Sequence, residues 1–188
     1  MQNHLAHVPD LRGTRGRRYD LAHILLFSIL AVLSGAASYR KIQKFMEIHH
    51  KKLIEIFNLQ WKRAPAHTTI RDIFKRVEED DFEQVFRSHS RAILPDEHDA
   101  VMCVAVDGKT LKGSFDHVNG VKAAHIVDAF AVGSQIILGH FTTNSKSNEI
   151  PAVQAFIQEL GLSGCVFTMD AMHCQKKHLK SCLEPTTD

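Results

Sequence analysis

The sequence predicts an α+β protein, with a helical front half and a back half ordered strand, strand, strand, helix, strand. From Leu21 to Leu94, apolar residues recur at steps of three and four, which is the spacing of amphipathic helices. The polar stretch Pro95–Asp99 ends this pattern, and beyond it continuous and alternating apolar runs indicate strands. We therefore place a domain boundary at this break.

Size, charge and cysteine content limit the class of protein. The 188 residues, 44% of them hydrophobic, are enough to bury one large core or two small ones. The 23 basic and 21 acidic residues give a formal net charge of +2, which neither requires nor excludes a nucleic-acid partner. The four cysteines form no CxxC pair, so we expect free thiols and a reducing, cytoplasmic location.

The segment Leu21–Ala37 is strongly apolar and follows the arginine-rich stretch Arg12–Arg18, as a signal peptide or membrane anchor would. Its length falls short of the ~20 residues that comfortably cross a bilayer, and His23 lies inside it. A buried core helix is favoured over a membrane segment, and we expect no membrane partner.

A second helix is predicted after the turn at Gly35, with Ser38 as its N-cap. One face of this helix is apolar and is expected to pack on the core, while its lysines fall mainly outside that face. The residues of the apolar face are Ile42, Phe45, Met46, His49, Leu53, Ile56 and Phe57.

Two more helices are predicted after Pro65. Thr68 or Thr69 can cap the first of them, and Asp80 with Glu83 resembles a capping box for the second. Both helices carry apolar stripes that extend the core of the front half. The residues of these stripes are Ile70, Ile73, Phe74, Val77, Phe82, Val85, Phe86 and Ile93.

The helix after Pro65 turns Arg71, Lys75 and Arg76 away from its apolar stripe. In a helix-turn-helix-like pair, such a basic face could lie on DNA phosphates. Scattered basic residues are equally typical of a helix surface that faces only solvent. We favour this second interpretation. The three residues are candidates for DNA binding.

Three strands are predicted at the start of the back half. Val101–Val106 is a continuous apolar run, typical of a strand buried on both faces, and it ends at Asp107. Ala123–Val132 and Gln135–Thr142 follow, joined through Gly133-Ser134 as a two-residue turn with glycine first. These three strands are expected to form an antiparallel meander.

A helix predicted over Glu149–Leu160 and ended by Gly161 leads to a fourth strand, Cys165–Met169. A right-handed crossover through this helix would lay the fourth strand parallel to the first. Asp107 and Asp170, which follow these two strands, would then meet at neighbouring strand ends.

Two carboxylates held close together repel each other unless a cation compensates, and Mg²⁺ or Mn²⁺ is the usual cation for oxygen ligands. Two such ions ~3.5 to 4 Å apart activate the attacking oxygen and stabilise the leaving oxygen in phosphodiester chemistry. Lys109, Lys112 and Lys146 could hold substrate phosphates, although a lysine at a strand end is more often only solvated. On spacing alone, turn capping remains the main alternative for both aspartates.

Three separated blocks resemble the signature blocks of insertion-sequence transposases: residues 106–114 (VDGKTLKGS), 146–152 (KSNEIPA) and 169–177 (MDAMHCQKK). The branch is the one that includes the H-repeat-associated proteins found beside Rhs elements, and the resemblance covers roughly residues 10–177. It implies a helical transposase-associated domain over 1–98, a partial ribonuclease-H-like catalytic domain over 99–177 and a divergent tail over 178–188.

The resemblance also implies a function, which is DNA transposition by a three-carboxylate (DDE) enzyme acting with Mg²⁺ or Mn²⁺ on insertion-sequence ends. Asp107 and Asp170 match the first two acids of the family, which are catalytic and bind the metal. Glu149 lies in the second block and could assist at the metal site. The first turn of a helix favours acids in any case, so a structural role for Glu149 is at least as well supported.

The third acid of the family has no counterpart that we recognise. The late candidate Glu184 lies in a proline-containing tail without a helical pattern. Because a missing ligand misplaces the attacking oxygen, and ~1 Å of misplacement can cost a hundredfold in rate, we expect a truncated copy that does not cut DNA alone. The alternatives are a non-enzymatic DNA-binding fragment that assembles with a full-length transposase, an oligomer that completes the site, and an unstable relic.

Overall fold

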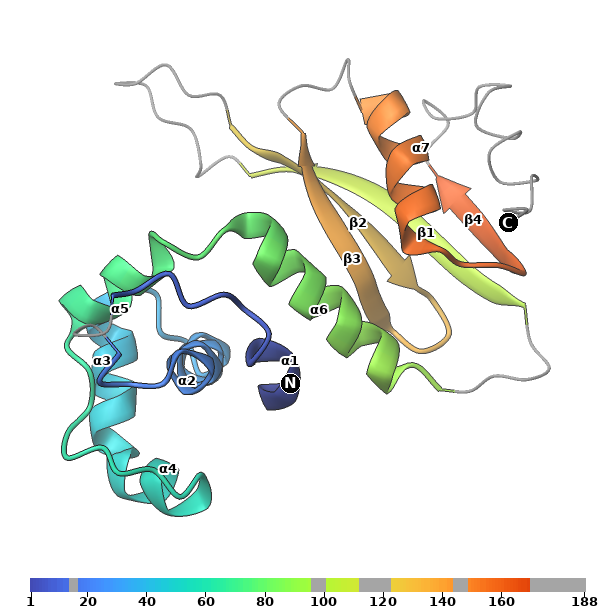
Figure 1. Ribbon diagram of the computed structural model, residues 1–188. Coiled ribbons are helices and arrows are strands. Elements are labelled where there is room, and N and C mark those ends of the chain that lie inside the picture. Colours follow the sequence, from blue (N-terminus) through green and yellow to red (C-terminus); the bar gives the residue numbers. More distant parts are fainter. Residues whose placement is uncertain (14–16, 96–100, 112–122, 144–148, 170–188) are drawn as a thin grey trace. The chain divides into compact units, whose positions relative to one another are not determined.

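The computed structural model is mixed α+β, as predicted (Figure 1). It describes residues 1–13, 17–95, 101–111, 123–143 and 149–169. The chain divides into two compact units, Met1–His89 and Ser90–Asp188, and each is described by itself. The boundary predicted at residues 98 and 99 lies outside the described residues and stays a prediction.

The described elements run in the order expected from the sequence, with helices first and then strand, strand, strand, helix, strand. The helices are α1 (Gln2–Leu5), α2 (Leu21–Leu33), α3 (Tyr39–Ile48), α4 (His50–Ile56), α5 (His67–Phe74), α6 (Glu79–Ile93) and α7 (Glu149–Leu160). The strands are β1 (Met102–Thr110), β2 (His125–Ala131), β3 (Ile136–Thr143) and β4 (Cys165–Met169).

Helix α2 forms the centre of the first unit. It begins at the N-cap Asp20, whose carboxylate accepts the backbone N–H of His23. Ile24, Leu25 and Phe27 are almost completely buried, so the apolar segment is a core helix, as predicted. Among the described residues, no helix has the length and apolarity needed to cross a membrane.

The prediction of a single helix after Ser38 is wrong. The chain forms two helices, α3 and α4, that meet at His49. Ser38 is the N-cap of α3, as predicted. His49 departs from helical geometry, with φ of −94° and ψ of 5°, and this change shifts the apolar face by part of a turn. Ile56, predicted to be buried, is consequently 63% exposed. The residues of the predicted face that are buried are Ile42, Met46 and Leu53.

Helix α5 begins without the predicted threonine cap. Its first residue is His67, so Thr68 and Thr69 lie inside the helix. The backbone N–H of His67 donates instead to Oε1 of Gln43 in α3, at 2.7 Å. A side chain from another helix therefore does what a local cap would do. The predicted apolar stripe is confirmed, with Ile70 and Ile73 buried.

Helix α6 also begins earlier than predicted. Asp80 lies in its first turn rather than at the N-cap, so the predicted capping box is wrong. The carboxylate of Glu83 accepts the Nε–H of Arg87 one turn later, at 2.8 Å, and both side chains are largely buried. Ile93, at the end of the helix, was predicted to be buried in the core. It is 50% exposed, so this prediction is wrong.

The sheet of the second unit has the strand order β3-β2-β1-β4. β1 pairs antiparallel with β2, and β2 with β3, which confirms the meander. β1 does not end at Asp107 as predicted but continues to Thr110. The β2–β3 connection spans Val132–Gln135 rather than two residues, and its left-handed residue is Gln135, with φ of 58°, rather than Gly133.

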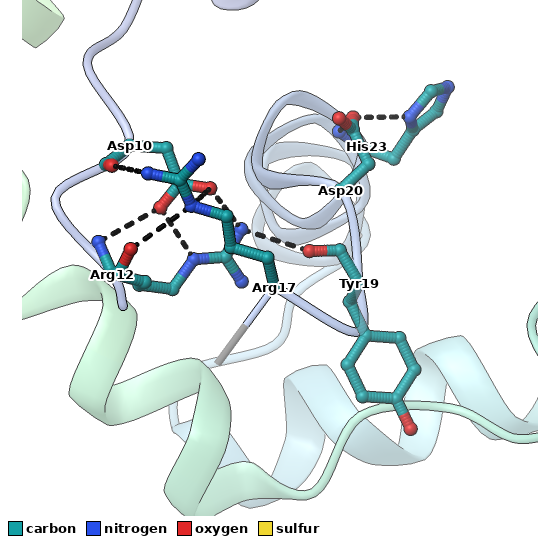
Figure 2. Close-up of polar contacts among 6 residues, drawn as sticks. All are labelled: Asp10, Arg12, Arg17, Tyr19, Asp20 and His23. Atoms are coloured by element: carbon teal, nitrogen blue, oxygen red, sulfur yellow. Dashed lines mark hydrogen bonds and ion pairs between the residues drawn. The ribbon is translucent and has the colours of Figure 1, made fainter. Parts of the chain in front are cut away.

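The buried Arg12 side chain connects Asp10, in the N-terminal segment of the first unit, to Tyr19, just before α2 (Figure 2). Arg12, only 8% exposed, donates from Nε and Nη2 to the two carboxylate oxygens of Asp10, each at 2.7 Å. Nη2 also donates to the backbone carbonyl of Tyr19, at 2.9 Å. The side-chain hydrogen bonds from Arg12 are the main cause that lowers the pKa of Asp10 from its ordinary value of 3.8, and the charges of Arg12 and Arg17 lower it further.

We expect Asp10→Ala to lower the free energy of unfolding of the first unit by about 3 kcal/mol near neutral pH, because it leaves a buried guanidinium without its counter-charge. The lowered pKa of Asp10 means that its contribution is complete above pH 3.8 and is lost as the pH falls through the folded-state value. Urea titrations at several pH values, read by the fluorescence of the single tryptophan, Trp61, measure this difference.

The exposed pair of Arg71 and Asp72, 3.1 Å apart, provides the matched control. Asp72→Ala is expected to cost less than about 1 kcal/mol, because solvent screens an exposed pair. An effect of Asp10→Ala that stays undiminished well below pH 3.8 would contradict the ion-pair explanation.

Candidate functional site

The parallel pairing of β1 and β4 defines the edge of the sheet at which the two predicted aspartates would meet. The register runs from Met102 opposite Cys165 to Val106 opposite Met169. This pairing confirms that the crossover through α7 returns the fourth strand parallel to the first (Figure 1). The last residue of β4 therefore lies beside the residue that precedes Asp107.

Apolar packing holds the crossover in place. Val104 and Val106 of β1 are buried on the face of the sheet that α7 covers, with Val153, Phe156 and Ile157 of that helix. Because side chains alternate along a strand, the next residue, Asp107, points from the opposite face.

Asp107 is open to solvent and already has a cation beside it. Its side chain is 64% exposed, and the Nζ of Lys109 lies 3.5 Å from its Oδ2. Carboxylate oxygens are the ligands that Mg²⁺ and Mn²⁺ prefer, so Asp107 supplies one oxygen ligand of that type.

Asp128 is an acidic residue at this face that sequence reasoning missed. It lies in β2 directly opposite Asp107, and His140 of β3 lies opposite Asp128. Residues directly opposite each other in antiparallel strands share a face, so the carboxyl groups of Asp107 and Asp128 are neighbours. Buried and half-buried residues alternate along His125–Ala131, which places Asp128 on the half-buried face. Its position opposite Asp107 follows only once the register with β1 is known.

The other predicted site residues divide between the two units. Of those in the second unit, Lys109 lies beside Asp107, whereas Lys112, Lys146, Asp170 and the side chain of Glu149 lie outside the described residues. In the first unit, Arg71, Lys75 and Arg76 are exposed on or just after α5, and Arg71 contacts Asp72. The described residues contain no cluster of three or more His, Cys, Asp or Glu side chains suited to hold a metal.

Comparison with known proteins finds a family and several relatives. Residues 2–90 match the family described as DDE_Tnp_1-associated. The H repeat-associated putative transposase YhhI of Escherichia coli (strain K12) is 32% identical over 176 residues, which are 94% of this chain and 46% of YhhI.

Two shorter relatives are covered more fully. YbfD of Escherichia coli (strain K12), also described as an H repeat-associated putative transposase, is 30% identical over 94% of this chain and 68% of its own length. The putative transposase YncI of the same strain is 30% identical over 93% of this chain and 69% of its own length. The chain spans about half the length of YhhI, at 46%, and no solved structure matches it.

We expect Asp128→Asn to stabilise the second unit by about 0.5 kcal/mol, because it removes one of two like charges that face each other across β1 and β2. Thermal unfolding followed by circular dichroism, with hydrogen exchange at the β2 amides, measures the change. The gain should shrink in high salt, which screens exposed charges. A loss of stability would mean that the Asp128 carboxylate makes a favourable contact of its own.

Proposed function

The chain belongs to the family of H repeat-associated transposases, and from this premise we propose that it carries part of the site for DNA transposition. The proposed chemistry is metal-dependent phosphodiester cleavage and strand transfer at insertion-sequence ends. The observation that carries the proposal is the pairing of Val106 with Met169, since Asp107 and Asp170 are the residues that follow each of them.

The topology supports a ribonuclease-H-like catalytic unit. β1 to β3 form an antiparallel meander, α7 covers the sheet and β4 runs parallel to β1, as the sequence pattern predicts. The resemblance implies a ribonuclease-H-like fold for this part of the chain. In this proposal, Asp107 and Asp170 are the first two catalytic acids and hold Mg²⁺ or Mn²⁺. Bound at this edge, the ions would supply Lewis-acid activation and charge neutralisation at a phosphodiester.

The protein's own groups would position the DNA. Lys109, 3.5 Å from Asp107, is placed to neutralise a phosphate oxygen once a metal ion competes for the carboxylate. Lys112 and Lys146 are proposed to add positive charge around the same site, and Glu149 to assist the acids from the start of α7. In the first unit, the exposed Arg71, Lys75 and Arg76 are proposed to contact the DNA backbone.

We further propose that these 188 residues alone hold two of the three acids and do not cut or join DNA. A two-acid site binds its ions weakly and leaves the attacking oxygen poorly placed. The second candidate function is a non-enzymatic DNA-binding protein that competes with, or assembles with, a longer transposase. The match of residues 2–90 to a transposase-associated domain, together with the exposed basic residues of α5, favours this candidate.

Incubation of the purified chain with DNA carrying insertion-sequence ends and Mg²⁺ or Mn²⁺ is expected to give salt-dependent binding without strand cleavage. Denaturing gels detect cleavage, and band shifts at increasing salt detect binding. Cleavage that Asp107→Ala abolishes would refute the proposed inactivity of the chain alone. Cleavage that arises only on mixing with a longer relative would indicate a site completed by a partner.

Metal binding can be measured without cleavage. We expect Asp107→Asn to weaken Mn²⁺ binding by about tenfold, or about 1.4 kcal/mol, because it removes an anionic oxygen ligand. Calorimetric titration of the wild type and the variant measures this change. Asp72→Asn, which alters an exposed aspartate of α5, is the control and should leave Mn²⁺ binding unchanged. Equal affinities of wild type and Asp107→Asn would remove Asp107 from the proposed site.

A further inference from the structure

A cavity of about 510 Å³ opens in the first unit. One wall comes from the segment that leads into α2 and includes Arg12, Arg17, Arg18 and Tyr19, and the other comes from Gln60 and Trp61 after α4. The cavity is open to solvent and mostly polar, and its volume exceeds the space of a single ion. All lining residues belong to Met1–His89, so the cavity is distinct from the edge of the sheet that carries Asp107.

Two carboxylates line the cavity, and each has a partner of its own. Asp10 accepts two hydrogen bonds from the Arg12 guanidinium and one from the Arg12 backbone N–H. Asp20 accepts the ring Nδ1 of His23 at 2.6 Å, and Figure 2 shows its carboxylate directed toward that ring. Among the described residues, three arginines and two aspartates line the cavity, which leaves an excess of one positive charge.

Arg17 is held in a fixed position mainly by neutral groups. Its Nε donates to the backbone carbonyl of Arg12 at 3.0 Å, and its Nη2 donates to that of Asp10 at 2.9 Å (Figure 2). The nearest carboxylate contact in this network is longer, 3.7 Å from Nε to Oδ2 of Asp10. The backbone carbonyls orient the guanidinium, and the ion pair with Asp10 offsets part of its charge, while the side chain stays 53% exposed to solvent.

Aromatic rings complete the cavity. The guanidinium of Arg18 lies 5.9 Å from the centre of the Tyr19 ring, and the Tyr19 and Trp61 rings meet edge to face with centres 5.0 Å apart. Trp61 is half-buried and Arg18 is exposed. The cavity thus presents two exposed guanidinium groups, with the half-buried Trp61 in its wall.

We propose that this cavity binds a DNA strand, with Arg17 and Arg18 on a backbone phosphate and the adjoining nucleotide against Trp61. Guanidinium groups match the geometry of phosphate oxygens, and an aromatic ring stacks on any base without selecting its sequence. The inference rests on the proposed function, because DNA is taken as the source of the phosphate. It adds a contact site separate from α5 and from the catalytic acids.

Trp61 is the single tryptophan of the chain, so its fluorescence reports occupation of the cavity directly. We expect a short oligonucleotide, without divalent metal, to quench this fluorescence. Arg18→Gln should weaken binding about tenfold and lower the slope of log affinity against log salt by about one, because one phosphate contact is lost. Arg40→Gln removes the same charge from an exposed position of α3 and should leave both values near those of the wild type.

A second variant distinguishes loss of the aromatic contact from loss of the fold. Trp61→Phe, followed by the anisotropy of labelled DNA, should weaken binding without changing the salt slope, because it alters the aromatic contact and no charge. Circular dichroism checks that each variant is folded. Inorganic phosphate and a deoxynucleoside monophosphate, titrated in place of DNA, should quench only at far higher concentrations.

Several results would overturn the inference: equal effects of Arg18→Gln and Arg40→Gln, no quenching by DNA at low salt, or saturation by inorganic phosphate as tight as by DNA. The Mn²⁺ titration separates these outcomes from failure of the proposed function, because it depends on Asp107 and uses no DNA. Asp107→Asn should retain the quenching of Trp61, which shows that the two sites are independent.

Discussion

The parallel pairing of β4 with β1 is the constraint on which the second unit and its candidate active site depend. β4 has β1 as its only strand neighbour in the described sheet, so that ladder and the helix that leads into the strand hold it in place. The buried Val153 and Phe156 of α7 anchor this helix on Val104 and Val106. Burial of one such aromatic side chain contributes roughly 2 to 3 kcal/mol. The same packing leaves Asp107 on the other face, available for chemistry.

Charged side chains are arranged differently in the two units. In the first unit, the buried Arg12 has a carboxylate partner and a backbone carbonyl, and this pairing makes burial of a charge tolerable. In the second unit, Asp107 of β1 lies directly opposite Asp128 of the neighbouring strand β2, and Lys109 lies beside Asp107. Like charges at such close quarters cost stability, and the Lys109 ammonium beside Asp107 offsets part of that cost.

The residues proposed to contact DNA and those proposed to bind metal lie in different units. The transposase-associated part, residues 2–90, contains the exposed basic residues of α5 and the arginine-lined cavity beside Trp61. The second unit contains the sheet edge with Asp107. Proposed DNA contact in one unit and proposed metal chemistry in the other require no shared side chains. The chain spans 46% of the length of YhhI, so the activity of the whole protein is part of the proposal.

The sequence alone determined the features encoded by neighbouring residues: the bounds of α7, the cap Ser38, the burial of α2 and the order of the strands. Periodicity and capping act over a few residues, so a local pattern specifies them. Only the tertiary structure decided that Gln43 caps α5 from 24 residues away and that Asp128 lies opposite Asp107. It also decided that Arg17 and Trp61 share a cavity, because contacts between distant residues depend on how the elements pack.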